Sequence, residues 1–140
     1  MYVFSRRDAH QRLARELGAT WVGHSTESPP EKLHASIIFA PVGHLVPHAL
    51  QALERGGTVA MAGIHSSDIP PLVYDRDLFQ ERSLQSVTAN TRQDGLDLFR
   101  VAAEIPIRTQ TQAFRLEEAN QALQALKAGT INGAGILAIG

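Results

Sequence analysis

The apolar and polar positions alternate between strand-like and helix-like patterns from the first residues onward. The run 1–4 is apolar, as in a strand buried on both faces, and a polar turn follows it directly. Leu13 and Leu17 lie four residues apart and share one face of a helix that we expect Asp8 to cap. Gly18 stands where a helix C-terminus is expected. The pattern predicts a strand followed by an amphipathic helix.

The same alternation continues to the end of the chain. Further strands are expected at 20–23, 36–40, 58–63, 84–88, 109–114 and 133–140, and helices at 44–55, 92–105 and 116–127. The glycine pair 56–57 is expected to end the second helix, a capping box of Thr91 and Asp94 to begin the third, and Pro106 to end it. Trp21 and Phe99 are expected to pack in the core. Alternating strands and helices predict an α/β fold of three layers with a mostly parallel sheet.

Composition narrows the classes of function. The 140 residues fit one domain, and the formal net charge of −1 gives no reason to expect nucleic acid as a partner. No apolar run is long enough to span a bilayer, so we expect no membrane partner and a cytoplasmic location. The sequence has no cysteine, which excludes disulfides and thiolate metal sites. His44 and His48 have a spacing compatible with a metal, but nothing nearby completes a ligand set.

Ligands of open α/β sheets bind beyond the carboxyl ends of the strands. The first such end carries Ser5, Arg6 and Arg7. If this strand is the second of a dinucleotide-binding sheet, a hydroxyl and two guanidiniums suit the 2′-phosphate of NADP, whereas NAD-binding sheets place an acidic residue there. The alternative is a pair of solvated arginines, and the pattern alone leaves both open.

Three stretches resemble the C-terminal, cofactor-domain part of zinc-type medium-chain alcohol dehydrogenases. These are "VFSRRDAHQRLARELGATWV", "ALQALERGGTVAMAGI" and "EANQALQALKAGTINGAGILAI", in that order and at the family's spacing. The resemblance implies an incomplete Rossmann-like fold lacking the first strand and the Gly-rich turn, divided into Rossmann elements at 1–105 and a closing helix and strand at 106–140. It also implies that Ala134 stands where many relatives have an arginine near the pyrophosphate.

The resemblance further implies an oxidoreductase that transfers hydride between an alcohol or aldehyde and the nicotinamide of NADP. The cofactor-binding residues would be Ser5, Arg6, Arg7, Ala40, Pro41, Val42, Gly63, Ile64, His65, Ala89 and Asn90. The zinc ligands would belong to a domain that this chain lacks, so no catalytic or metal-binding residue is assigned here. We therefore expect a fragment that is inactive alone and binds cofactor weakly.

Two alternatives and one mode of assembly accompany this interpretation. The chain could instead be a non-catalytic Rossmann-like module for nucleotide binding or assembly, or a segment of a zinc-free quinone-type reductase. His65 could be a cofactor-loop residue or a plain loop residue. Unpaired strand edges predict a homo-oligomer formed through sheet edges, with the segment 68–74 as the candidate contact.

Overall fold

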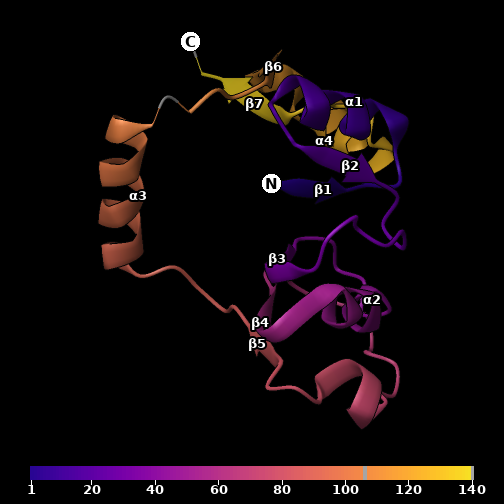
Figure 1. The fold of residues 1–140 in the computed structure, drawn as a ribbon. Helices are drawn as coiled ribbons and strands as arrows, with labels where there is room; N and C mark the ends of the chain where they lie inside the picture. Colours follow the sequence, from indigo (N-terminus) through magenta and orange to yellow (C-terminus); the bar gives the residue numbers. More distant parts are fainter. Residues whose placement is uncertain (106, 140) are drawn as a thin grey trace.

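The fold of the computed structural model, which describes residues 1–105 and 107–139, alternates short strands and helices (Figure 1). The strands are β1 (Tyr2–Phe4), β2 (Trp21–Gly23), β3 (Leu33–Ile38), β4 (Leu53–Met61), β5 (Ser83–Ser86), β6 (Thr111–Arg115) and β7 (Ala134–Ala138). The α-helices are α1 (Asp8–Glu16), α2 (Leu45–Ala52), α3 (Arg92–Glu104) and α4 (Ala119–Ala128). A π-type turn, η1 (Tyr74–Leu78), and a 3₁₀ turn, η2 (Leu116–Glu118), complete the described elements.

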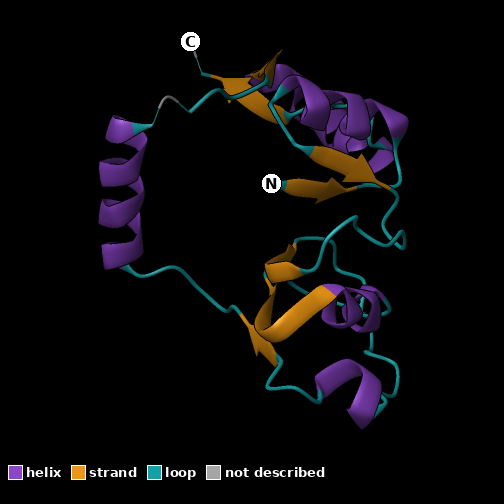
Figure 2. Cartoon of the chain, in the orientation of Figure 1, coloured by secondary structure: helices purple, strands orange, loops and turns teal. Residues whose placement is uncertain are grey.

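Every strand pair in the described residues is parallel, as the sequence predicts. The strands form three small sheets, in the orders β1-β2, β3-β4-β5 and β6-β7, in place of one continuous sheet. Figure 2 shows the β1-β2 sheet and the β3-β4-β5 sheet apart from each other, each with helices beside it. The expected α/β class is therefore confirmed, while the strands do not join into a single layer.

The best-packed part of the chain lies between α2 and the β3-β4-β5 sheet. Val46, Leu50, Leu53 and Val59 are fully buried there, and Ile38 is nearly so. These side chains come from one face of α2 and from the adjacent faces of β3 and β4. This small core fixes the ends of β3 and β4, and those ends carry half of the predicted site.

Three expected element boundaries are wrong. Arg7, not Asp8, is the N-cap residue of α1, and Asp8 is the first helical residue. The second helix ends at Ala52, and β4 runs through the glycine pair that was expected to stop the helix. Gly56 has φ 72°, and the pairing register between β3 and β4 shifts there. The glycines therefore form a bulge in a strand, where a left-handed residue is tolerated.

The third helix begins as predicted but does not pack as predicted. Thr91 and Asp94 form the expected capping box: the Thr91 amide donates to the Asp94 carboxylate and the Asp94 amide donates to the Thr91 hydroxyl. The helix itself stands away from the three sheets (Figure 1). Phe99, expected in the core, is 75% exposed, because no element of the described structure covers its face of α3. The predicted stop at residue 106 lies outside the described residues.

Some strand bounds shift by a few residues, as in β3, which covers Leu33–Ile38 where 36–40 was expected, while the predictions for Trp21 and for two helix ends agree with the structure. Trp21 packs edge-on against Phe4, with ring centroids 5.1 Å apart, and tilts against Tyr2 at 5.8 Å. Gly18 and Gly129 end α1 and α4 in left-handed conformations with φ 92° and 65°. The helix-ending glycines follow from local sequence, whereas the contacts of Trp21 depend on the pairing of β1 with β2.

Candidate functional site

The ends of β3 and β4 form a tightly joined rim. The carbonyl of Ile38 accepts hydrogen bonds from the amides of Ala62 (2.9 Å) and Gly63 (3.1 Å). A Cβ atom at Gly63 would lie only 2.9 Å from the Phe39 carbonyl oxygen and 3.0 Å from that of Ala40. Glycine is therefore required for the two strand ends to approach each other, and this brings the predicted residues Ala40 and Gly63 together.

The loops that continue from these two strands also interlock. The amide of Gly43 donates to the Ser67 hydroxyl at 2.9 Å, and the Ser67 amide donates to the Pro41 carbonyl at 3.3 Å. Gly43 is buried, and a Cβ atom there would overlap the main-chain oxygens of Ser67 and Asp68. We call this pair of loops, residues 40–43 and 63–68, the rim clasp. It holds the predicted residues 40–42 against 63–65.

Two members of the rim clasp, Gly43 and Ser67, are not among the predicted cofactor-binding residues. The stretch "HSSD" at 65–68 was the sole signal, since serine and aspartate commonly bond to nearby main-chain groups in turns. His65 has φ 58°, an uncommon left-handed conformation for a residue other than glycine.

The turn of Ser5, Arg6 and Arg7 is ordered by its own hydrogen bonds. The Ser5 amide donates to the Gly23 carbonyl (3.0 Å), which extends the β1-β2 pairing, and the Ser5 carbonyl accepts from the Gln11 side chain (2.7 Å). The Ser5 hydroxyl accepts a 3.4 Å hydrogen bond from the Arg7 amide. Ser5 thus lies at the carboxyl end of a strand, as predicted, while Arg6 is exposed to solvent.

Arg7 has a second contact that the sequence did not indicate. Its guanidinium donates to the carbonyls of Ala128 (3.2 Å) and Gly129 at the end of α4. A cation at that position is favoured by the negative end of the helix dipole and satisfies two carbonyls that the helix leaves free. Arg7 therefore joins two segments more than 120 residues apart, and part of its hydrogen-bonding capacity is used there.

The other predicted site residues are not drawn into these contacts. Ala89 and Asn90 lie in the exposed segment between β5 and α3, and Ile64 is exposed at the outer side of the rim clasp. Within residues 1–105 and 107–139, no group of three or more His, Cys, Asp or Glu is placed to hold a metal. No helix in the same described ranges is both long and apolar enough to cross a bilayer.

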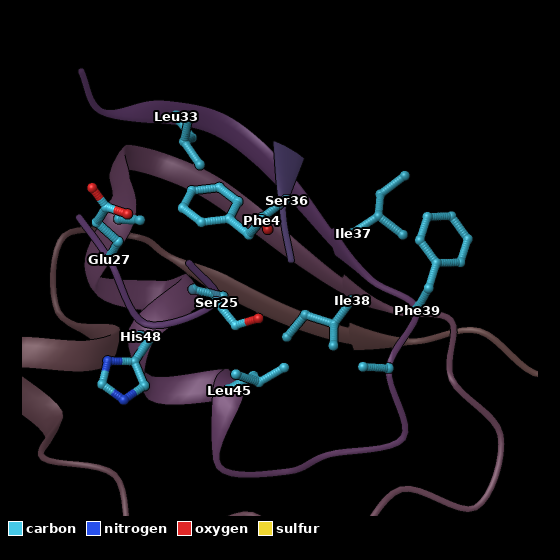
Figure 3. A pocket seen from close by; sticks show the side chains of 13 residues that line it. Phe4, Ser25, Glu27, Leu33, Ser36, Ile37, Ile38, Phe39, Leu45 and His48 are labelled. Atoms are coloured by element: carbon cyan, nitrogen blue, oxygen red, sulfur yellow. The ribbon is translucent and has the colours of Figure 1, made fainter. Parts of the chain in front are cut away.

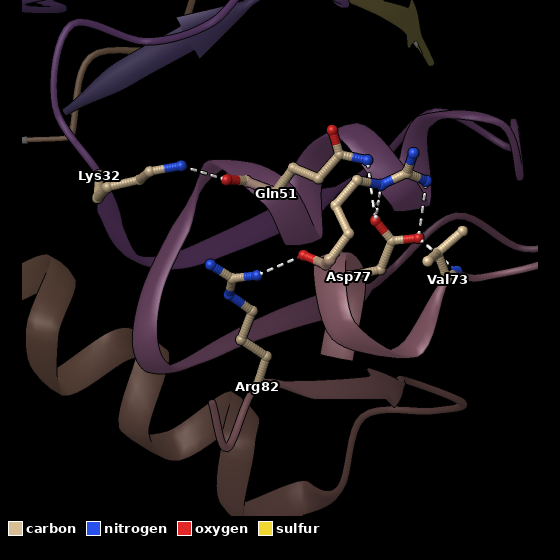
Figure 4. A network of polar contacts seen from close by, with 6 residues as sticks. Lys32, Gln51, Val73, Asp77 and Arg82 are labelled. Carbon is tan, nitrogen blue, oxygen red and sulfur yellow. Dashed lines mark hydrogen bonds and ion pairs between the residues drawn. The ribbon is translucent and has the colours of Figure 1, made fainter. Parts of the chain in front are cut away.

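A buried carboxylate on η1 organises the segment next to the rim clasp (Figure 4). Asp77 is fully buried and accepts hydrogen bonds from Arg76 (2.7 and 3.0 Å), the Gln51 amide group (2.9 Å) and the Val73 amide (2.8 Å). These donors, the Arg76 guanidinium above all, lower the pKa of Asp77 to about 2. Arg82 extends the network by donating to the carbonyls of Leu53 (3.0 Å) and Arg76 (2.8 Å).

No residue pattern predicts this network. The stretch "YDRD" resembles any charged loop, and only the tertiary fold places Gln51 of α2 beside it. Its role is positional, because it holds the 73–82 segment against α2 and β4. That segment leads from the rim clasp into β5.

A cavity of about 190 Å³ is lined by residues of β1, β3 and α2 (Figure 3). Its wall is mostly apolar, with Phe4 from β1, Ile37 and Ile38 from β3 and Leu45 from α2. His48 contributes polar atoms at its margin. Of the predicted site residues only Ala40 lies on its wall, and Phe4, also on the wall, directly precedes the predicted Ser5.

Comparisons with known proteins show which proteins this chain is similar to. No family model matches the chain. A Mycobacterium tuberculosis protein named "Probable alcohol dehydrogenase AdhA" is 47% identical over 139 residues, which are 99% of this chain and 40% of that protein. An alcohol dehydrogenase of Geobacillus stearothermophilus is 28% identical over 134 residues, covering 90% of this chain and 39% of that protein. The chain thus spans about 40% of the length of these curated relatives.

Solved structures give the same result for the fold. A cinnamyl alcohol dehydrogenase of Sorghum bicolor superposes with a TM-score of 0.82 at 15% identity, over 97% of this chain and 40% of that one. Benzyl alcohol dehydrogenase of Acinetobacter calcoaceticus gives 0.76 at 16% identity, over 98% and 42%. Over nearly its whole length the chain therefore resembles the C-terminal, cofactor-domain part of the alcohol dehydrogenases, as its sequence pattern predicts.

Proposed function

We propose that the chain is the cofactor-binding part of an NADP-dependent, zinc-type alcohol dehydrogenase and does not catalyse hydride transfer alone. The observation that carries this proposal is the 47% identity, over 99% of the chain, to a protein named as a probable alcohol dehydrogenase. When bound, the nicotinamide would accept or donate hydride at the substrate carbon. In this proposal the zinc belongs to another part of the complete enzyme; among residues 1–105 and 107–139, no group of three or more His, Cys, Asp or Glu is placed to hold a metal.

The rim clasp supports the nicotinamide half of the proposed site. Close main-chain approach at Gly63 and Gly43 holds the two loops together, so that their main-chain groups can act jointly on a bound ring. Residues 40–42 and 63–65 would line this half. Ala89 and Asn90, which follow the end of β5, would also line the nicotinamide half.

The turn after β1 supports the adenosine half. Ser5 offers a hydroxyl and Arg6 an exposed guanidinium, and Arg7 as N-cap residue of α1 makes no side-chain cap. A 2′-phosphate would therefore meet hydroxyl, guanidinium and free helix amides together. Arg7 would add a second guanidinium by exchanging its contact with the α4 carbonyls for the phosphate.

Titration with 2′-phospho-AMP and with AMP tests the cofactor assignment. One charge-assisted hydrogen bond is worth about 1.5–3 kcal/mol, so Arg6→Ala should weaken 2′-phospho-AMP binding about tenfold or more and leave AMP unchanged. Arg6→Ala with Arg7→Ala should remove the preference altogether. Arg12→Ala, an exposed arginine on the same helix, is the matched control and should change neither affinity. Equal binding of the two nucleotides by the unmodified chain would refute the NADP assignment.

The proposal includes a cytoplasmic location and a homo-oligomer that forms through sheet edges. The segment 68–74 remains the candidate contact, because Ile69, Val73 and Tyr74 are exposed beside the β3-β4-β5 sheet. Light scattering across a hundredfold range of concentration tests this. A mass equal to one chain at every concentration would refute it.

A further inference from the structure

Arg7 holds together two parts of the chain that are far apart in the sequence. Its Nη1 and Nη2 groups donate to the carbonyls of Gly129 and Ala128, which brings α1 and the end of α4 together (Figure 1). Arg7 is exposed, and no carboxylate among residues 1–105 and 107–139 forms an ion pair with it. The contact is therefore a pair of hydrogen bonds from a cation to neutral groups, which a charged acceptor can replace.

The end of α4 and a phosphate would use the same part of this arginine. Bidentate recognition of an anion uses two N–H groups of the guanidinium fork. Both terminal nitrogens of Arg7 already donate to carbonyls of α4. The main chain of Arg7 is meanwhile held at the turn after β1, since its amide donates to the Ser5 hydroxyl at 3.4 Å. A phosphate bound at this turn therefore competes with α4 for the guanidinium.

The two acceptors differ in charge, so the competition has a direction. The carboxyl end of a helix carries about half a negative elementary charge, whereas a phosphate monoester carries about −1.5 to −2 at pH 7. Lys127 in the last turn of α4 keeps a cation near the helix end when Arg7 leaves. A bound phosphate should therefore take Arg7 from α4, and the α4 contact should in turn lower the apparent affinity for that phosphate.

The last turn of α4 is the element that would respond. The Gly129 and Thr130 amides each donate to a carbonyl of the helix at 3.0 Å, next to the carbonyls that Arg7 contacts. Further along, the Ala134 amide donates to the Gln110 carbonyl at 2.9 Å, which fixes the start of β7 to the segment before β6. Loss of the Arg7 contact should therefore loosen the end of α4 and leave β7 in place.

We propose that the carboxyl end of α4 is an internal competitor for the 2′-phosphate of the cofactor. In the free chain α4 holds Arg7, and a bound 2′-phosphate draws Arg7 to the turn of Ser5 and Arg6, which leaves the α4 end without this contact. Coupling between two binding events is reciprocal, so α4 lowers the affinity for the phosphate by the same factor by which the phosphate weakens the Arg7–α4 contact. This inference rests on the proposed function and adds a regulatory link between the cofactor site and α4.

The variant Gly129→Ala tests the competition. A Cβ atom at Gly129 would overlap the Arg7 guanidinium, so the variant should free Arg7 and raise the affinity for 2′-phospho-AMP about threefold to tenfold, with no change for AMP. Gly18→Ala adds a Cβ atom to another helix end with positive φ, in open space, and is the matched control that should change neither affinity. In the double variant Gly129→Ala with Arg7→Ala the gain should vanish, because no guanidinium remains to be freed.

Amide exchange in the unmodified chain tests the same link without a substitution. Saturation with 2′-phospho-AMP should speed exchange of the Gly129 and Thr130 amides about threefold or more, because the end of α4 loses its contact with Arg7. Saturation with AMP should leave both amides unchanged. The Ala134 amide is the internal control and should respond to neither nucleotide.

The outcomes separate this inference from the proposed function. If the unmodified chain prefers 2′-phospho-AMP but the two α4 amides do not respond, or Gly129→Ala leaves the affinity unchanged, only the competition is overturned and the NADP assignment stands. If the unmodified chain binds the two nucleotides equally, the NADP assignment fails and the competition fails with it.

Discussion

Removal of the buried carboxylate of Asp77 should destabilise the chain more than removal of any surface charge. Asp77→Ala deletes the acceptor of four hydrogen bonds and leaves the Val73 amide and the Gln51 side chain without their partner. The perturbation is local, because Asp77 lies on a single turn that packs on α2. The exposed neighbour Asp75 offers a matched control on the same turn.

The magnitude follows from those four contacts. Each unsatisfied donor costs about 1–3 kcal/mol, while the Arg76 ion pair adds about 1 kcal/mol or less because the Arg76 side chain is 55% exposed. We therefore expect Asp77→Ala to lower the free energy of unfolding by about 3 kcal/mol. With a urea m-value of about 2 kcal/mol/M, the midpoint should fall by about 1.5 M. Asp75→Asn should shift it by less than about 0.3 M.

The same residue predicts a pH dependence. The pKa of Asp77 is about 2 in the folded chain, below its ordinary value of 3.8, so its contribution is fully present above about pH 4 and is lost as the pH falls through 2. Urea unfolding of the unmodified chain and of Asp77→Asn should therefore differ by a constant amount above pH 5 and converge towards pH 2. A midpoint difference below 0.3 M at pH 7, or one that grows as the pH falls, would refute this reasoning.

Three further substitutions test single contacts by thermal or urea unfolding and circular dichroism. Gly129→Ala should destabilise the chain by about 2 kcal/mol, because it strains a residue with positive φ and displaces Arg7. Gly18→Ala is the control, since it adds only the backbone strain. Equal losses of stability in the two variants would contradict the Arg7 contact. Gly43→Ala should lower the free energy of unfolding by about 2 kcal/mol or more, because it opens the rim clasp. Gly95→Ala, in open space on α3, is the control and should be neutral or stabilising. A Gly43→Ala variant as stable as the unmodified chain would count against the clasp. Thr91→Ala should remove about 1 kcal/mol of helix capping and reduce the helical signal, and an unchanged spectrum would argue against the capping box.

Much of the local structure could be read from short stretches of sequence. The capping box needs only Thr91 and Asp94, three residues apart, and the ends of α1 and α4 need only Gly18 and Gly129. The parallel class follows from alternating strand and helix patterns, since parallel strands require crossover connections. The strand ends at Ser5, Ala40 and Gly63 were predicted for the same reason.

The boundaries failed where a local signal had two possible meanings. A glycine pair can end a helix or form a bulge in a strand, and at Gly56 the pairing of β4 with β3 produces the bulge. The apolar stripe that includes Phe99 predicts burial, but a stripe is buried only if another element covers it. Neither outcome is decided by the residues of the element itself.

The sequence alone determined the elements of this protein, their parallel arrangement and the chemistry available at each strand end, because these depend on residues near one another in the chain. Only the tertiary structure decided which of those groups meet. It placed Arg7 on the end of α4, Gln51 beside Asp77, and Gly43 against Ser67. It also brought residues of β1 and β3 to the wall of one mostly apolar cavity. These outcomes depend on main-chain close approach and on packing between distant segments, which no spacing of residue types records.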